Sequence, residues 1–175
     1  MYRARDTRLE RTVAVKVLPE QFSQNPDLKL RFEREAKAIS ALNHPNICTL
    51  HDVGHQDGVD YLVLEYIEGE SLSARLVRGP LPVEQVLKTG REIAEALEKA
   101  HRQGIVHRDL KPGNVMLTKS GAKLLDFGLA KPTGGAMQPG SVLTQALTES
   151  SPASPITAQG HIVGTFQYMA PEQVE

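Results

Sequence analysis

The sequence has little of several features that define special classes of protein. It contains one cysteine, Cys48, so no internal disulfide can form and a reducing compartment is expected. Its 20 basic and 21 acidic residues leave no basic excess for nucleic acid or anionic lipid. No apolar run approaches the ~18–20 residues that cross a bilayer, and the arginine-rich start is unlike a secretory signal. We therefore expect a cytoplasmic protein with no membrane segment in this chain and no nucleic-acid partner.

The composition is that of an ordinary globular domain. Hydrophobic residues make up 40% of the 175 residues and charged residues 23%, which suits one folded domain. Aromatic residues are only 5%, and tryptophan is absent, so the core is expected to be mostly aliphatic.

Hydrophobic periodicity predicts strands and helices in a mixed order. Strands are expected at Thr12–Leu18, Cys48–Val53 and Asp60–Tyr66, helices at Asp27–Leu42 and Val83–Arg102, and a hairpin at Val115–Leu117 with Ala122–Leu125. In the second helix one side is expected to contain Val86, Leu87, Ile93, Ala94, Leu97 and Ala100. From Thr133 to Gly160 the Ser, Thr, Pro and Gly content predicts a mobile loop. The order of elements indicates an α+β protein.

One segment between the second helix and the hairpin has residues suited to phosphate chemistry. It reads His107-Arg108-Asp109-Leu110-Lys111-Pro112-Gly113-Asn114 and is called the catalytic loop below. A carboxylate, a cation and a metal-binding amide, at Asp109, Lys111 and Asn114, could together hold a hydroxyl nucleophile, a phosphate and Mg²⁺. The segment resembles the H-R-D-L-x-x-x-N loop of protein kinases without a mismatch. The alternative is an ordinary polar loop after a helix.

The resemblance to protein kinases implies roles for these residues and for two further motifs. Asp109 would orient the hydroxyl and accept its proton, while Lys111 would stabilise charge on the γ-phosphoryl group of ATP. Asn114 and Asp126, the latter in Asp126-Phe127-Gly128, would hold Mg²⁺. Lys16, in Val13-Ala14-Val15-Lys16, would grip the α- and β-phosphates.

Glu35 is the expected partner of Lys16. It lies on the apolar stripe of the first helix between Phe32 and Ile39, where a carboxylate needs a cation. The family's lysine–glutamate pair supplies one, and a surface glutamate is the alternative.

The same resemblance implies an adenine site. The backbone of Glu65, Tyr66 and Ile67, called the hinge below, would hydrogen-bond the adenine edge, with Leu64 at the back of the pocket. Ala14 and Met116 would sandwich the ring. An internal column would consist of Ile39, Leu50, His107 and Phe127. Each of these residues could equally be an ordinary core residue.

The segment Gly164–Glu172 resembles the end of a kinase activation segment. Lys111 and Thr165 favour serine or threonine as the acceptor in a protein substrate. Arg108 would bind a regulatory phosphate, with Thr157 the first candidate for modification and Ser154 the second.

A zinc site is an alternative reading of Cys48, His51 and His55, which have a suitable spacing. Strand positions three apart point to opposite faces, and no convincing fourth ligand follows. Core and turn positions are therefore the preferred interpretation.

The resemblance implies a bilobal protein-kinase-like fold of a bacterial type, truncated at both ends. Residues 1–67 would form an N-lobe fragment with one long helix and the hinge, and residues 68–175 a partial helical C-lobe with the catalytic loop and activation segment. The family's glycine-rich loop would precede Tyr2, and further helices would follow Glu175. The expected function is ATP-dependent phosphoryl transfer to Ser/Thr, which residues 1–175 alone should perform poorly. The alternative is a catalytically inactive fragment or nucleotide-binding remnant.

Overall fold

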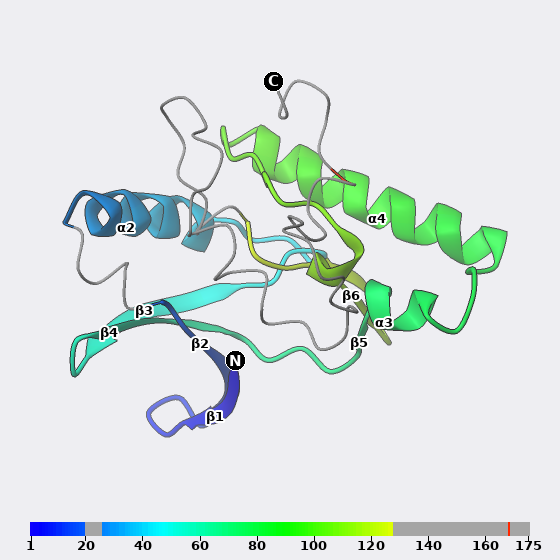
Figure 1. The fold of residues 1–175 in the computed structure, drawn as a ribbon. Helices are drawn as coiled ribbons and strands as arrows, with labels where there is room; N and C mark the ends of the chain where they lie inside the picture. The colour runs from blue at the N-terminus through cyan, green and yellow to red at the C-terminus, as the bar shows by residue number, and fades with distance from the viewer. Residues whose placement is uncertain (20–25, 128–167, 169–175) are drawn as a thin grey trace, which may run out of the picture.

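The computed structural model describes residues 1–19, 26–127 and 168 (Figure 1). Its main elements are β1 (Tyr2–Asp6), β2 (Arg11–Val17), α2 (Pro26–Ser40), β3 (Leu50–Gln56), β4 (Val59–Glu65), β5 (Glu70–Ser71), α3 (Leu72–Leu76), α4 (Val83–His101), β6 (Val115–Thr118) and β7 (Gly121–Leu124). A short 3-10 turn, Pro112–Asn114, precedes β6. The strands and helices that periodicity predicts are all present, within a few residues of their expected ends.

The first sheet is antiparallel, with strand order β1-β2-β4-β3. Alternating β-branched residues make β2 a natural strand, and its register places Ala14 opposite Leu64. The β3–β4 hairpin turns at Asp57 and Gly58, whose φ angles of 52° and 79° are those that Asp-Gly turns favour. Sequence periodicity missed β1, an edge strand in which charged residues alternate with Tyr2 and Ala4.

Helix α2 packs against this sheet through a stripe of apolar residues. Phe32, Ala36 and Ile39 are buried, and they belong to one core cluster with Leu62 and Leu64 of β4. Figure 1 shows α2 alongside the β3–β4 part of the sheet. The position of α2 determines where Glu35, on the same helix, can reach.

The second half is built on a smaller sheet, with strand order β5-β6-β7, and on α4. Ala96 and Ala100 of α4 are fully buried. The expected apolar face of this helix is partly wrong, because Val86 and Leu87 are 51% and 69% exposed and Ala94 is also exposed.

Glu92 takes part in the buried face of α4 instead. Its Oε2 accepts a hydrogen bond of 2.7 Å from the Ala122 backbone N–H, and the residue is 8% exposed. A Cβ on Gly121 would lie 2.8 Å from Glu92 Oε1, and the φ of 127° at this position is one that side-chain-bearing residues rarely adopt, so both features favour glycine there. A polar residue thus fixes the contact that hydrophobic periodicity assigned to apolar side chains.

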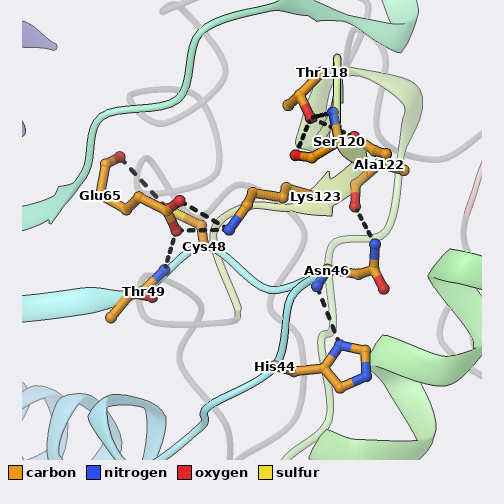
Figure 2. A network of polar contacts seen from close by, with 10 residues as sticks. His44, Asn46, Cys48, Thr49, Glu65, Thr118, Ser120, Ala122 and Lys123 are labelled. Atoms are coloured by element: carbon orange, nitrogen blue, oxygen red, sulfur yellow. Dashed lines mark hydrogen bonds and ion pairs between the residues drawn. The ribbon is translucent and has the colours of Figure 1, made fainter.

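The segment between α2 and β3 joins the two halves of the molecule. The Cys48 N–H donates to Leu124 O at 2.8 Å, and the Leu124 N–H donates to Asn46 O at 2.8 Å. Asn46 Nδ2 also donates to Ala122 O at 2.7 Å (Figure 2). One continuous hydrophobic cluster therefore extends from the first sheet through this segment to α4 and β7.

Among the described residues, no helix combines the length and apolar character needed to cross a membrane.

Replacing Glu92 with alanine tests the contact between α4 and the hairpin. Glu92→Ala leaves the buried Ala122 N–H unpaired, so the free energy of unfolding should fall by about 1–3 kcal/mol. Chemical denaturation of the intact protein measures this change. Glu95→Ala, at a half-exposed position of the same helix, is the control and should change stability by less than about 0.5 kcal/mol. Equal stability of the two variants would contradict this role for Glu92.

Candidate active site

The catalytic loop is anchored by His107. Its Nε2 donates to Leu125 O at 2.8 Å, and its Nδ1 accepts from the Asp109 N–H at 3.3 Å, which requires the neutral ring with the proton on Nε2. Its ring centroid lies 4.7 Å from that of Phe127. Burial lowers the pKa of His107, against the opposing effects of its bond to Leu125 O and of the Asp109 and Asp126 carboxylates. The imidazole therefore acts as a neutral structural link.

Three of the predicted catalytic-loop side chains lie together. Asp109 Oδ2 is 3.1 Å from Lys111 Nζ and accepts a hydrogen bond of 3.0 Å from Asn114 Nδ2. Asn114 Nδ2 also donates to the Asp109 backbone carbonyl at 2.8 Å. The Asp109 and Lys111 side chains are 19% and 24% exposed, so their charges are partly shielded from water.

Two residues of the site have backbones in the left-handed region. Arg108 has φ of 62° and Asp126 has φ of 53°, conformations that non-glycine residues adopt at a cost of about 1–3 kcal/mol. Strain of this kind concentrates at functional sites, and here it turns the chain sharply beside Asp109 and before Phe127.

Asp126 forms an ion pair with Lys16 across the two halves of the molecule. Lys16 Nζ lies 2.8 Å from Asp126 Oδ1, and the side chains are 23% and 29% exposed. Since strand side chains alternate, Ala14 lies on the same face of β2 as Lys16. That face is therefore turned toward the segment that follows β7.

The expected ion pair between Lys16 and Glu35 is not formed in this structure. Glu35 Oε1 instead lies 3.2 Å from Arg108 Nη1, with both side chains 33% exposed. The physical reason is that Asp126 occupies the Lys16 ammonium group, while the turned backbone of Arg108 brings a second cation within reach of α2. Glu35 therefore has a cationic partner, as its position on the helix predicts, but a different one.

Some polar groups of the hinge already form contacts within the protein. The Glu65 N–H donates to Thr49 O at 2.9 Å, so this residue can offer a nucleotide only its carbonyl. The Cys48 thiol contacts that carbonyl at 3.8 Å, which leaves its second lone pair for another donor. Tyr66 is partly covered by Arg3, whose guanidinium carbon lies 4.9 Å from the ring centroid.

Sequence reasoning missed the partner of the Glu65 carboxylate, which is Lys123 of β7. The ammonium nitrogen lies 2.8 Å from Oε1. The sequence gives only a weak signal for Lys123 as this partner, because a lone lysine in a short hairpin strand is usually a surface residue.

The residues expected to surround the nucleotide lie at the same junction. Ala14 and Leu64 are buried, 8% and 9% exposed, and Met116 is partly buried in β6. The residues of the expected internal column, Ile39, Leu50, His107 and Phe127, are all buried.

Asn114 and Asp126 have the chemistry that a magnesium site needs. Amide and carboxylate oxygens suit this hard cation, which takes few protein ligands and completes its shell with water and phosphate. The Leu125 N–H donates to Asn114 O at 2.9 Å, which holds the two candidate ligands on adjoining segments. The residues therefore fit Mg²⁺, and Asp126 is paired with Lys16 in this structure.

The zinc alternative is not supported. Cys48, His51 and His55 contact different partners, namely Glu65 O, Arg11 and Asp60. Burial, with further effects of the Glu65 and Asp126 carboxylates, raises the pKa of the Cys48 thiol to about 12, which disfavours the thiolate that binds metal. Within the described ranges there is no cluster of three or more His, Cys, Asp or Glu residues that could hold a metal.

The predicted regulatory residues Thr157 and Ser154 lie outside the described residues, as do Thr165, Glu172 and the expected mobile loop at 133–160.

Comparison with known proteins identifies the family. The model of the protein kinase domain matches residues 1–175. The chain belongs to the protein kinase family. It is 38% identical to a probable serine/threonine-protein kinase of Clostridium perfringens, over all of this chain and 23% of that protein. It is 39% identical to the serine/threonine-protein kinase PknA of Mycobacterium tuberculosis, over 99% of this chain and 38% of that protein.

The solved kinase domain of M. tuberculosis PknI has the same fold. It superposes with a TM-score of 0.67 at 34% identity, over 74% of this chain and 53% of that one. The expected α+β, protein-kinase-like fold and the bacterial type of its relatives are thereby confirmed. The chain spans about a quarter to two fifths of the length of these curated relatives and about half of that kinase domain.

The pH dependence of stability tests the neutral state of His107. Because burial lowers its pKa in the folded protein, the unfolded chain binds more protons once pH falls below the ordinary value of about 6.5. Stability should therefore be fully present above about pH 6.5 and decrease as pH falls from there toward the folded-state pKa. Denaturation at several pH values should give a shallower decrease for His107→Gln, whose amide can still donate to Leu125 O. Identical slopes for variant and wild type would rule out this assignment.

Proposed function

We propose that this kinase-family chain transfers the γ-phosphoryl group of ATP to serine or threonine residues of a protein substrate. The observation that supports the proposal most is that Asp109 Oδ2 lies 3.1 Å from Lys111 Nζ and 3.0 Å from Asn114 Nδ2 on an anchored loop. This arrangement has a base, a cation for developing negative charge, and an oxygen ligand for a metal. The proposal includes the division into two lobes, with residues 1–67 as the N-lobe fragment and residues 68–175 as the C-lobe fragment.

The reaction assigns a separate task to each of these side chains. Asp109 orients the substrate hydroxyl and accepts its proton as the oxygen bonds to the γ-phosphorus. The bond from the γ-phosphorus to the β,γ-bridging oxygen breaks, and ADP leaves. Lys111 lies beside Asp109 and stabilises the charge on the transferred group.

ATP would occupy the space between the two sheets. Lys16 would bind the α- and β-phosphates, the hinge would bind the adenine edge, and Ala14 and Met116 would cover the two faces of the ring. Asn114 and Asp126 would hold Mg²⁺, which when bound neutralises charge on the phosphates. We propose a cytoplasmic location for this reaction.

The proposed reaction requires the two ion pairs at the site to exchange. Lys16 must release Asp126 for it to bind metal, and Glu35 must release Arg108 to hold Lys16. A phosphate on the activation segment carries about −2 charge and competes with Glu35 for Arg108. We therefore propose that phosphorylation of Thr157, or secondarily Ser154, favours the exchange.

Two aspartate substitutions separate the roles of base and metal ligand. Asp109→Asn should lower phosphoryl transfer by at least about a hundredfold and leave the affinity for Mg·ATP nearly unchanged. Asp126→Asn should weaken Mg²⁺-dependent ATP binding itself. Transfer assays and nucleotide titrations of the intact protein measure the two effects.

The control for both is Asp57→Asn, in the exposed β3–β4 turn, where asparagine tolerates the same backbone conformation. It should behave as wild type. Near-normal turnover of Asp109→Asn would contradict the assignment of the base.

The phosphorylation sites are a separate prediction. Mass spectrometry of the active, intact protein should find phosphate on Thr157 before Ser154, and Thr157→Ala with Ser154→Ala should lower activity. Active protein with no phosphate between Lys131 and Gly164 would remove this part of the proposal.

A further inference from the structure

A partly buried ion pair joins the two halves of the molecule at the end of the hinge strand. Glu65 is the last residue of β4, and Lys123 lies within β7. Lys123 Nζ lies 2.8 Å from Glu65 Oε1 and 2.9 Å from Oε2 (Figure 2). The lysine side chain is 16% exposed and the glutamate 28%. Because both oxygens share one ammonium group that is largely shielded from water, the pair is stronger than an ordinary surface pair.

Lys123 shares a face of the second sheet with Met116. The two residues are directly opposite one another in the β6–β7 register, and opposite residues of an antiparallel pair project from the same face. Since Lys123 reaches Glu65 of the first sheet, this face is turned toward the junction of the two sheets. The lysine thus lies between the proposed floor of the adenine site and the hinge.

The Glu65 carboxylate is held from a second direction. Its Oε2 accepts a hydrogen bond of 3.2 Å from the Thr49 N–H. The residue before Thr49, Cys48, donates its N–H to Leu124 O at 2.8 Å, and Leu124 follows Lys123. These contacts close a ring from β7 through Glu65 and the segment before β3 back to β7. Figure 2 shows the part of the ring that joins Lys123, Glu65 and Thr49. A ring of this kind restricts rotation of the Glu65 side chain and of the peptide attached to it.

The charge balance of this ring depends on the lysine. Burial keeps Cys48 as the neutral thiol, so the ring contains one carboxylate, that of Glu65, and one ammonium group, that of Lys123. Removing the ammonium group would leave a partly buried carboxylate without its cation, which is far more costly than losing an exposed pair. The hinge residue would then have to move toward water.

We propose that Lys123 is a positioning residue of the nucleotide site: its ion pair with Glu65 fixes the direction of the Glu65 carbonyl that receives the adenine amino group. The inference rests on the proposed function, since it concerns the binding of ATP. Under this inference Lys123 affects the affinity for the nucleotide and not the rate of the transfer step. The reason is that the residues proposed for transfer lie on the catalytic loop, whereas Lys123 lies in β7.

The test measures adenosine binding, ATP binding and turnover in the intact protein. Adenosine lacks phosphates, so its affinity reports on the hinge apart from Lys16 and Mg²⁺. The variants are Lys123→Met, which keeps the length of the side chain without its charge, Lys123→Arg, Glu65→Gln, and the double variant Lys123→Met with Glu65→Gln. Lys119→Met is the matched control, because Lys119 is exposed at the tip of the same hairpin.

Lys123→Met should weaken binding of adenosine and raise the KM for ATP by about fivefold, with kcat nearly unchanged. Lys123→Arg should retain most of the affinity, and Lys119→Met should match wild type. In the Glu65→Gln background, Lys123→Met should cause no further loss, because its effect acts through that carboxylate.

Wild-type adenosine affinity in Lys123→Met would overturn the inference. The inference would also be overturned if Lys123→Met reduced adenosine affinity as much in the Glu65→Gln background as it does in the wild type. If Lys123→Met does not fold, Glu65→Gln is the deciding variant, because it keeps the shape of the side chain. It must then show the loss of adenosine affinity that is expected for Lys123→Met. A wild-type protein that binds neither adenosine nor ATP would contradict the proposed function itself, which distinguishes the two failures.

Discussion

The ion pair between Lys16 and Asp126 determines how the rest of the site is arranged. It spans the two halves of the molecule at 2.8 Å and joins β2 to the segment that follows β7. Because the Lys16 ammonium group is held by Asp126, the carboxylate of Glu35 is paired with Arg108 instead. Two carboxylates and two cations, each partly buried, thus form the pairs Lys16–Asp126 and Glu35–Arg108. Nucleotide binding would favour a different arrangement, in which Lys16 pairs with Glu35. With Mg²⁺ on Asp126 and a phosphate on Arg108, the proposed exchange would leave none of these charges unpaired.

A second set of contacts would keep the two halves together during the proposed exchange. The segment before β3 is hydrogen-bonded to β7 through Cys48 and Asn46, and the Glu65–Lys123 pair lies beside it. These contacts involve backbone groups or shielded charges, and two of the residues that make them, Cys48 and Leu124, belong to the continuous core. In the proposed exchange the junction would serve as a fixed support, and only the side chains at the site would change partners, namely those of Lys16, Glu35, Arg108 and Asp126.

Periodicity predicted the elements that bury a long apolar stripe, such as β2, α2 and the β6–β7 hairpin, because burial imposes the pattern on the sequence. It missed β1, where the charged residues of an edge strand obscure the alternation, and α3, whose five residues are too few for a helical period. It also misjudged part of α4, where Glu92 is buried by a backbone hydrogen bond. The catalytic-loop residues were found because a motif fixes them locally. The partners of Lys16, Glu35 and Glu65 could not be found in this way, since they depend on left-handed backbone at Arg108 and Asp126 and on contacts between distant segments.

The most direct test of this account is a crystal structure of the intact protein with Mg²⁺ and a non-hydrolysable ATP analogue. The account predicts that Asp126 and Asn114 contact the metal, and that Lys16 Nζ lies within about 4 Å of a Glu35 carboxylate oxygen. The phosphates would lie against Lys16. A bound nucleotide in a structure where Lys16 still pairs with Asp126, and Glu35 with Arg108, would contradict it.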